Sequence, residues 1–286
     1  MLNEDEQLNA LVTAALKEDI GDGDHSTLCC IPAGVSGKAV LKIKQDGIIA
    51  GITVAEKIFR QVQHAVAFTK YLEDGEPAKF GDKAFEVEAK VHTILQCERL
   101  VLNCMQRMSG IATLTRKYSD RLKGYKTKIL DTRKTTPNFR VLEKEAVRIG
   151  GGENHRMGLY DMIMLKDNHI DYCGSIAKAI QLAYEYVQSN KPAMKIEVET
   201  RSVDDVKKVI AAGEGRVTRI MLDNFVPAAI VEAMVIINGR FETEASGGIN
   251  LDNIIEYADT GVDYVSVGAL IHQAQSLDLS LKAVIN

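Results

Sequence analysis

Apolar residues recur at different spacings along the chain, and the spacing divides it into two halves. Residues 5–17 carry apolar side chains at helical spacing, and residues 19–24 break the pattern as a loop. From Gly37 to about Lys90 the apolar period is mostly two, which predicts short strands. The expected strands lie at 40–43, 48–49, 68–71 and 85–91, with one helix near 53–63. This half predicts a small α+β sheet domain.

A long helix is expected from about Ile94 to Lys123, and beyond it strand and helix patterns alternate. Six short strand-like runs each end in a polar or small residue and recur roughly every 20 to 35 residues, the length that a parallel βα unit needs. The runs end at Asp131, Lys166, Glu199, Asp223, Ser246 and Gly268.

Two architectures can hold such a series: a barrel with fewer than eight strands, or an open doubly wound sheet. Both place function at the carboxyl ends of the strands. Polar groups at every strand end favour the barrel, because an open sheet concentrates them at one switch point. We therefore predict a sheet domain over residues 1–110 and a catalytic barrel over 111–274, with the tail 275–286 free to pack back on the first domain.

Composition and charge narrow the classes of function. A net charge of −4 over 286 residues gives no electrostatic reason for a nucleic-acid or membrane partner. No apolar run approaches a membrane span, and the acidic start lacks the apolar core of a signal peptide. The five cysteines are odd in number and lack C-x-x-C spacing, so no disulfide framework or zinc site is expected and a reducing, cytoplasmic compartment fits.

Cations gather after the first two runs of the second half. Arg133 and Lys134 follow the first run, where arginine offers a planar fork for a carboxylate or phosphate and lysine a point charge. His155 and Arg156 follow three glycines, and Lys166 ends the second run. Each alone is readily explained as a solvated surface group. Together they predict a rim that binds anions.

Carboxylates come next, and then small residues. Glu199 and Asp223 end neighbouring runs and suit a magnesium ion that also touches a diphosphate, although helix capping is the alternative. We expect Glu197 to point elsewhere along its strand. Segments 246–248 and 268 predict phosphate cups of backbone N–H groups, each opening a helix. The layout predicts a barrel enzyme for a phosphorylated, metal-bound, strongly anionic substrate.

Several motifs occur in order over nearly the whole length. They are Glu18-Asp19, Gly23-Asp24, Glu98-Arg99, Asn103, 106–113 (QRMSGIAT), 131–137 (DTRKTTP), 154–156 (NHR), 165–169 (LKDNH), 222–224 (LDN), 246–248 (SGG) and 268–270 (GAL). Together they resemble the quinolinate phosphoribosyltransferase family, also called carboxylating nicotinate-nucleotide pyrophosphorylases.

The resemblance implies an α/β fold: an incomplete, six- to seven-stranded α/β barrel with an N-terminal α+β sandwich-like domain. It implies transfer of phosphoribosyl from 5-phosphoribosyl 1-diphosphate to quinolinate with decarboxylation, giving nicotinate mononucleotide, diphosphate and CO2 in de novo NAD biosynthesis. Mg2+ is the implied cofactor. A homodimer with shared active sites is implied, and a higher oligomer stays open.

The resemblance also implies a role for each matching position. Those that hold quinolinate match Arg99 (from the partner subunit), Arg133, His155, Arg156 and Lys166. Those that serve the donor match Lys134, Glu199, Asp223, Ser246, Gly247, Gly248, Gly268 and His272, with Glu199 and Asp223 at the metal. Asn138 and Glu145 depart from residues common in the family, and neither is an expected contact.

Three other functions stay open. A relative with the same fold and donor could take a monocarboxylate pyridine, although the four cations Arg99, Arg133, Arg156 and Lys166 favour two carboxylates. An aldolase-like barrel could use Lys166 as a Schiff-base amine. A non-catalytic barrel could sense a phosphorylated metabolite, binding the donor without releasing diphosphate.

Overall fold

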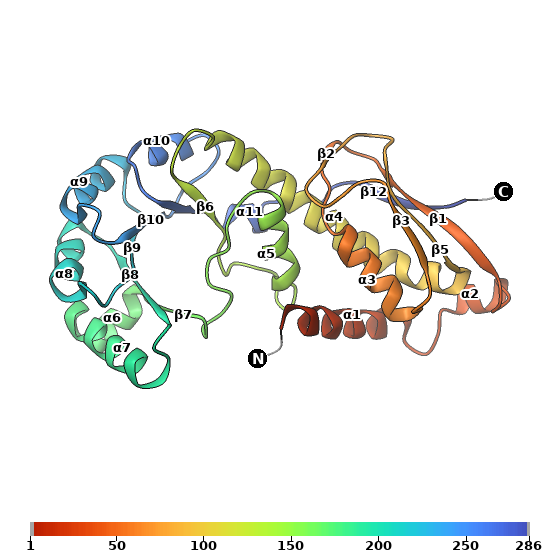
Figure 1. The fold of residues 1–286 in the computed structure, drawn as a ribbon, viewed down its shortest axis with the longest axis horizontal. Coiled ribbons are helices and arrows are strands. Elements are labelled where there is room, and N and C mark those ends of the chain that lie inside the picture. Colours follow the sequence, from red (N-terminus) through yellow and green to blue (C-terminus); the bar gives the residue numbers. More distant parts are fainter. Residues whose placement is uncertain (1–2, 285–286) are drawn as a thin grey trace. The chain divides into compact units, whose positions relative to one another are not determined.

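The computed structural model describes residues 3–284, which form two compact units (Figure 1). The first unit holds the described residues up to Arg116, Thr135–Gly151 and the segment from Leu270. The second holds Lys117–Lys134 and Gly152–Ala269. Within residues 3–284, no helix combines the length and apolar character needed to cross a membrane.

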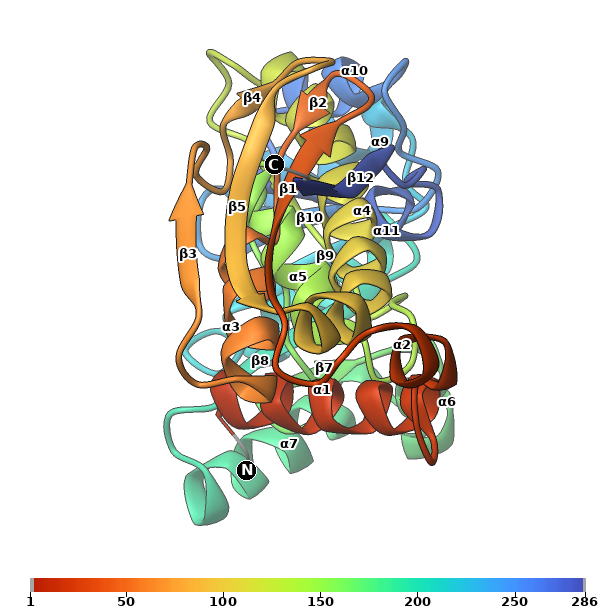
Figure 2. The ribbon, with the colours of Figure 1, turned by 90° about the vertical axis from the view of Figure 1, so that its right-hand side faces the viewer.

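An antiparallel sheet with strand order β12-β1-β5-β3 forms the body of the first unit (Figure 2). Its strands are β1 (Ser36–Ile43), β3 (Ala67–Lys70), β5 (Lys83–Lys90) and β12 (Leu279–Val284), and β2 (Gly47–Ile48) pairs separately with β4 (Pro77–Ala78). Leu281 of β12 lies opposite Leu41 of β1. The last described strand therefore completes the sheet that the first strand begins.

Helices and aromatic packing complete this unit. The helices are α1 (Glu4–Ile20), α2 (His25–Cys30), α3 (Ile52–Val62), α4 (Val91–Arg121, in this unit to Arg116), α5 (Arg140–Ile149) and α11 (Ala269–His272, from Leu270). Phe59 of α3, Phe68 of β3 and Phe85 of β5 pack together, with the Phe68 and Phe85 rings stacked at 4.5 Å between centroids. The core of this unit is thus apolar, as the period of two predicts.

One local expectation was wrong, and one short helix was not predicted. Residues 19 and 20 are the last turn of α1, because the helix ends only at Gly21, which has φ 57° and donates its N–H to the Lys17 carbonyl. Residues 25–30 form α2, which Asp24 caps by accepting from the Thr27 amide.

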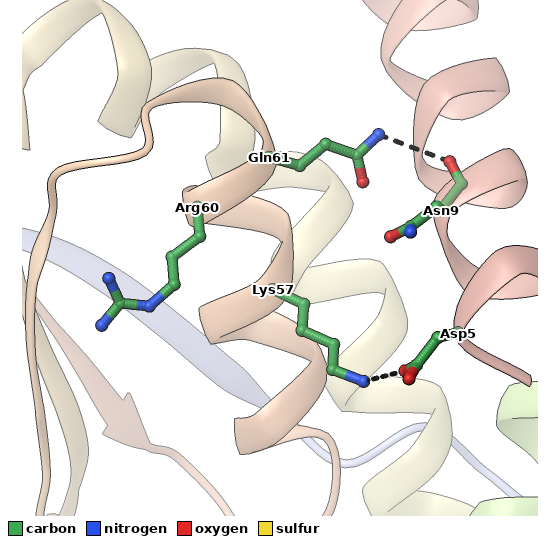
Figure 3. A pocket seen from close by; sticks show the side chains of 5 residues that line it. All are labelled: Asp5, Asn9, Lys57, Arg60 and Gln61. Atoms are coloured by element: carbon green, nitrogen blue, oxygen red, sulfur yellow. Dashed lines mark hydrogen bonds and ion pairs between the residues drawn. The ribbon is translucent and has the colours of Figure 1, made fainter.

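Polar side chains join α1 to α3 around a surface pocket of this unit (Figure 3). Lys57 Nζ lies 2.5 Å from Asp5 Oδ1, and Gln61 Nε2 donates to the Asn9 carbonyl at 3.3 Å. The pocket is lined by Asp5, Asn9, Lys57, Arg60 and Gln61, none of which belongs to the predicted site.

The second unit contains a six-stranded parallel sheet with the order β6-β11-β10-β9-β8-β7. Its strands are β6 (Lys128–Leu130), β7 (Met162–Leu165), β8 (Lys195–Thr200), β9 (Arg219–Asp223), β10 (Glu242–Ser246) and β11 (Tyr264–Ser266). From β7 to β11 neighbours follow chain order, and β11 then pairs with β6, the first strand. This single direction of travel is typical of a barrel, whereas a doubly wound sheet reverses its order.

The ring of strands stays incomplete between β6 and β7, which are not paired with each other in the described chain. Beside β6, Glu153 forms an isolated parallel bridge with Leu130, and its N–H donates to the Ile129 carbonyl at 2.8 Å. This segment is a rudimentary seventh strand. The predicted incomplete α/β barrel is confirmed.

Helices cover the outside of the curved sheet (Figure 1). They are α6 (Asp167–Cys173), α7 (Ile176–Asn190), α8 (Val203–Gly213), α9 (Pro227–Ile237) and α10 (Ile254–Asp259). Along β8, Ile196 and Val198 alternate with Glu197 and Glu199. Because successive side chains of a strand point to opposite faces, the apolar pair and the two carboxylates lie on different faces. All four side chains are buried.

Candidate active site

All predicted site residues except Arg99 and His272 lie in the second unit. Arg99 is exposed on α4, and His272 is exposed at the end of α11. Lys134 is exposed just beyond β6, where its backbone N–H donates to Thr132 Oγ1 at 3.1 Å. His155 and Arg156 follow the isolated bridge residue Glu153, and the remaining residues lie at or just beyond the carboxyl ends of the parallel strands, where barrel enzymes place their chemistry.

An ion pair joins the ends of β7 and β8. Lys166 Nζ lies 3.1 Å from Glu199 Oε2, and the Asp167 N–H donates to Glu199 Oε1 at 3.3 Å. Glu199 is buried while the Lys166 side chain stays 47% exposed. The Lys166 ammonium group is therefore accessible at the mouth of the barrel, and the buried Glu199 carboxylate holds it in place.

Asp223 and Ser246 extend this group along the sheet, because they lie directly opposite each other in the pairing of β9 with β10. Burial and then the charge of Glu199 raise the pKa of Asp223, while a hydrogen bond from Ser246 and the charge of Lys166 oppose the rise. Two carboxylates whose charges repel each other, one of them harder to ionise, form an arrangement that a divalent cation would relieve.

The turn after β10 requires glycine. Gly247 and Gly248 have φ values of 95° and 66°, and a Cβ on Gly247 would lie 2.2 Å from Asn224 Oδ1. The Asn224 N–H donates to the Ser246 carbonyl at 2.7 Å, so the two strand ends approach closely. The glycine pair does not open a helix as expected, because α10 begins only at Ile254. Gly268 does stand directly before α11.

Two guanidinium groups, those of Arg133 and Arg156, lie close enough for their charges to interact. Burial and then the charge of Arg133 lower the pKa of Arg156, and Glu197 and Asp161 only partly offset this. Arg156 Nη1 donates to the Met162 carbonyl at 3.2 Å. The buried Nε of Arg133 has no hydrogen-bond partner among the described residues. Like charges and an unsatisfied donor indicate a site that an anion would complete.

His155 occupies the interior rather than the rim. Its Nε2 lies 3.0 Å from Glu197 Oε2 and 3.2 Å from Glu244 Oε2, and the side chain is 5% exposed. The Arg156 N–H donates to His155 Nδ1 at 2.7 Å, and the His155 N–H donates to the buried Asp131 carboxylate at 2.9 Å. The expectation that Glu197 points away from the site was wrong, because it shares the inner face with Glu199.

Arg219 completes the interior polar group. Its Nη1 lies 3.0 Å from Glu244 Oε2, its Nη2 lies 3.0 Å from Glu242 Oε2, and its guanidinium carbon lies 4.1 Å from the centre of the Tyr264 ring. We call His155, Glu197, Arg219 and Glu244 the core ion cluster. The cluster alternates cations and carboxylates, as buried charges require.

The core ion cluster binds a proton tightly. Burial opposes the charged form of His155, but hydrogen bonds to and the charges of Glu197 and Glu244 prevail and raise its pKa to about 9. Burial and the charge of Glu244 raise the pKa of Glu197 to about 7. His155 and Arg219 hold the pKa of Glu244 below its usual range despite its burial. His155 Nδ1 accepts the Arg156 amide, so in this geometry the ring proton lies on Nε2, which faces the two carboxylates.

Comparison with known proteins identifies the family. The model of the quinolinate phosphoribosyl transferase C-terminal domain matches residues 111–282, and the model of the N-terminal domain matches residues 24–109. This chain belongs to the quinolinate phosphoribosyltransferase family.

Individual relatives agree over nearly the full length. Quinolinate phosphoribosyltransferase [decarboxylating] 1b of Nicotiana tabacum is 44% identical over 96% of this chain and 82% of its own. A probable carboxylating nicotinate-nucleotide pyrophosphorylase of Bacillus subtilis is 40% identical over 98% and 94%. The crystal structure of NadC from Streptococcus pyogenes superposes with a TM-score of 0.90 at 40% identity, covering 100% of this chain and 99% of that one.

Three interior residues of this chain were not predicted as part of any site: Glu197, Arg219 and Glu244. The available signal was the alternation of charged and apolar residues along 195–200 and 242–246. Such alternation is commonly taken to mean that polar residues face solvent. In this barrel the helices cover the apolar face, so the charged residues are enclosed.

Proposed function

We propose that this chain transfers the phosphoribosyl group of 5-phosphoribosyl 1-diphosphate to quinolinate and releases CO2. The products are nicotinate mononucleotide and diphosphate, and the reaction serves de novo NAD biosynthesis. The observation that carries the proposal is the buried Nε of Arg133, which has no hydrogen-bond partner among the described residues, together with an Arg156 guanidinium whose pKa is lowered by burial and by the charge of Arg133. A strongly anionic acceptor would neutralise both groups.

The quinolinate site is assigned to the cations at the mouth. Arg133, Arg156 and Lys166 would hold the two carboxylates, with His155 beside them in sequence. Arg99 would complete the site from the partner subunit of a homodimer. Exposed Arg99 and the half-exposed Lys166 ammonium leave charge available for a ligand. Two carboxylates match these cations better than one does, which favours quinolinate over a monocarboxylate pyridine.

The donor site is assigned to the strand ends that follow. Lys134 would face the diphosphate, and Glu199 and Asp223 the ribose and its metal. The 5′-phosphate would bind at the small residues of the last two strand ends and at the imidazole of the histidine beyond them. These residues are Ser246, Gly247, Gly248, Gly268 and His272. The positive φ angles of Gly247 and Gly248 leave their backbone open to an anion.

Magnesium fits the carboxylate pair on the chemistry of its donors. Glu199 and Asp223 supply the oxygen ligands that Mg2+ prefers, and burial and the charge of Glu199 raise the pKa of Asp223 even though the Lys166 ammonium lies beside Glu199. When bound, the ion would stabilise negative charge on the diphosphate. The carboxylates of the core ion cluster are less suited to a metal ion, because each of them already contacts a cationic side chain.

The reaction proceeds mainly by placement and electrostatics. The pyridine nitrogen of quinolinate attacks C1 of the ribose, the N–C1 bond forms, and the C1–O bond to diphosphate breaks. The carboxylate next to the nitrogen then leaves as CO2, and its electron pair stays on the ring carbon until a proton is added. Arg133, Arg156 and Lys166 would hold the ring so that its nitrogen faces C1. Lys134 would counter the charge that builds on diphosphate.

The Schiff-base alternative finds less support. Lys166 Nζ is held at 3.1 Å by the buried Glu199, so the side chain is engaged in an ion pair instead of being free to attack a carbonyl. The cytoplasm remains our proposal for the compartment, since all five cysteines are free thiols. Plant relatives bear names that specify chloroplast or mitochondrion.

The direct test mixes purified protein with quinolinate carrying a labelled 2-carboxylate, 5-phosphoribosyl 1-diphosphate and Mg2+. We expect one labelled CO2 for each nicotinate mononucleotide. Turnover of nicotinate in place of quinolinate would identify the monocarboxylate enzyme instead. Donor binding without diphosphate release would identify a sensor.

A further inference from the structure

The ring of His155 has both nitrogens occupied by the protein. Nε2 faces two carboxylates at 3.0 and 3.2 Å, and Nδ1 accepts the Arg156 amide at 2.7 Å. The side chain is buried, so a substrate at the mouth would find no ring nitrogen to bind. The neighbouring Arg156 donates from Nη1 to the Met162 carbonyl, and burial and the charge of Arg133 lower the pKa of its guanidinium.

The two carboxylates that hold the ring come from strands that are not neighbours. Glu197 lies on β8 and Glu244 on β10, with β9 between them. In a flat sheet such strands lie about 9.5 Å apart. The three polar atoms of His155, Glu197 and Glu244 nevertheless lie within 4.8 Å of one another. The inner face of the curved sheet brings them together, and the imidazole links both strands to the segment that carries Arg156.

Asp131 ties the same segment to the loop of Arg133. Its buried carboxylate accepts the His155 N–H at 2.9 Å, while its own N–H donates to the Glu153 carbonyl at 3.1 Å. The loops that carry Arg133 and Arg156 are thereby joined at residues 131, 153 and 155.

We propose that His155 is a positioning residue, held by Glu197 and Glu244, that fixes Arg156 in the anion site. This inference rests on the proposed function, because quinolinate is the anion that Arg156 would bind. The facing nitrogen and oxygen atoms of His155, Glu197 and Glu244 could also serve as metal ligands. However, Arg219 Nη1 lies 3.0 Å from the Glu244 oxygen that faces the imidazole. A guanidinium at that oxygen disfavours a metal ion there.

Glu244→Gln tests the proposal, and Glu242→Gln is its matched control. Glu242 and Glu244 both lie on β10, and each contacts Arg219 of β9, but only Glu244 contacts His155. For Glu244→Gln we expect kcat/KM for quinolinate to fall roughly ten- to a hundredfold, mainly through KM, because a small misplacement of a binding group has that cost. KM for the donor stays within about twofold, and Glu242→Gln leaves both constants within about twofold.

A double-mutant cycle tests whether the effect passes through the ring. In a His155→Leu background, Glu244→Gln should add no further loss for quinolinate. An equal loss in both backgrounds would overturn the proposal, and so would a donor KM that rises as much as that for quinolinate. Should Glu244→Gln fail to fold, Glu197→Gln makes the same test from β8.

Equilibrium binding of quinolinate by calorimetry separates this proposal from the assigned function. If the wild-type protein does not bind quinolinate, the proposed function fails and the positioning role fails with it. If the wild type binds but Glu244→Gln binds equally well, the proposed function stands and only the positioning role is wrong.

Discussion

The two units enclose opposite kinds of interior. The antiparallel unit buries a stack of phenylalanines, Phe59, Phe68 and Phe85, on its sheet. The barrel unit encloses the core ion cluster and turns the apolar side chains of its strands toward the covering helices. The difference teaches that burial alone does not predict chemistry. An apolar interior gives stability from packing, whereas a buried charge is tolerated only where another charge pairs with it, so its stabilisation depends on the protonation of its partners.

The largest expected effect is the loss of the phenylalanine core. Phe85→Ala removes a fully buried ring, and we expect unfolding to become easier by about 3–5 kcal/mol. Urea unfolding measures this. Glu88→Ala on the same strand is the control, because the Glu88 side chain is 58% exposed and its loss should change stability by less than about 0.5 kcal/mol. Similar losses in both variants would contradict an apolar origin.

The barrel should respond in activity rather than in stability. Arg133→Ala or Lys166→Ala should cost about 2–4 kcal/mol of transition-state binding, read from kcat/KM with quinolinate. Neither change removes buried apolar area, so unfolding should shift little. Lys207→Ala, on the exposed surface of α8, is the control. Near-normal turnover of either test variant would remove that residue from the site.

The enclosed charges should make stability depend on pH. The pKa of His155 is about 9 in the fold against an ordinary 6.5, so its stabilisation is fully present below pH 6.5 and is lost as pH rises through 9. The loss is on the order of 3 kcal/mol. Glu197 also binds its proton more tightly in the fold and adds a loss at lower pH, between 4.5 and about 7. Glu244 faces the same ring, and Arg219 contacts Glu244.

Urea unfolding at pH 6.5 and pH 9.5 measures that dependence. His155→Gln should lose distinctly less stability than the wild type over this interval. Equal losses in the two proteins would mean that the cluster does not hold the proton.

Magnesium dependence separates the mouth of the barrel from its interior. Glu199→Ala and Asp223→Ala should raise the Mg2+ concentration for half-maximal activity by roughly ten- to a hundredfold, the usual cost of disturbing a metal site. Titration of Mn2+ by electron paramagnetic resonance gives a reading that is independent of turnover. Glu242→Gln should leave both titrations unchanged. Unaltered titrations in both test variants would remove these carboxylates from the metal.

The smallest effect is expected at the surface pocket of the first unit. Lys57→Ala breaks the ion pair with Asp5, and both side chains are largely exposed (Figure 3). Such pairs contribute about 0–1 kcal/mol, so the melting temperature should hardly move. A loss comparable with that of Phe85→Ala would show that the joint between α1 and α3 matters far more than its exposure indicates.

Period and spacing predicted the outline of both units. Alternating apolar residues located β1 and β5, and the repeated strand and helix patterns located all six barrel strands within one or two residues. Residues 25–30 were not predicted as a helix, because a single capped turn leaves no periodic signal. The final strand β12 was not predicted either, since its pairing with β1 joins residues far apart in the sequence.

The sequence by itself determined which residues stand at the strand ends, because a run of apolar residues followed by Lys166, Glu199 or Asp223 has few other arrangements. Only the tertiary structure decided which way the alternating charges face. A strand has two faces, and its sequence does not say which one the helices cover. Closure of the sheet settled that choice, brought Glu197 and Glu244 from separate strands to one imidazole, and placed His155 beneath the site.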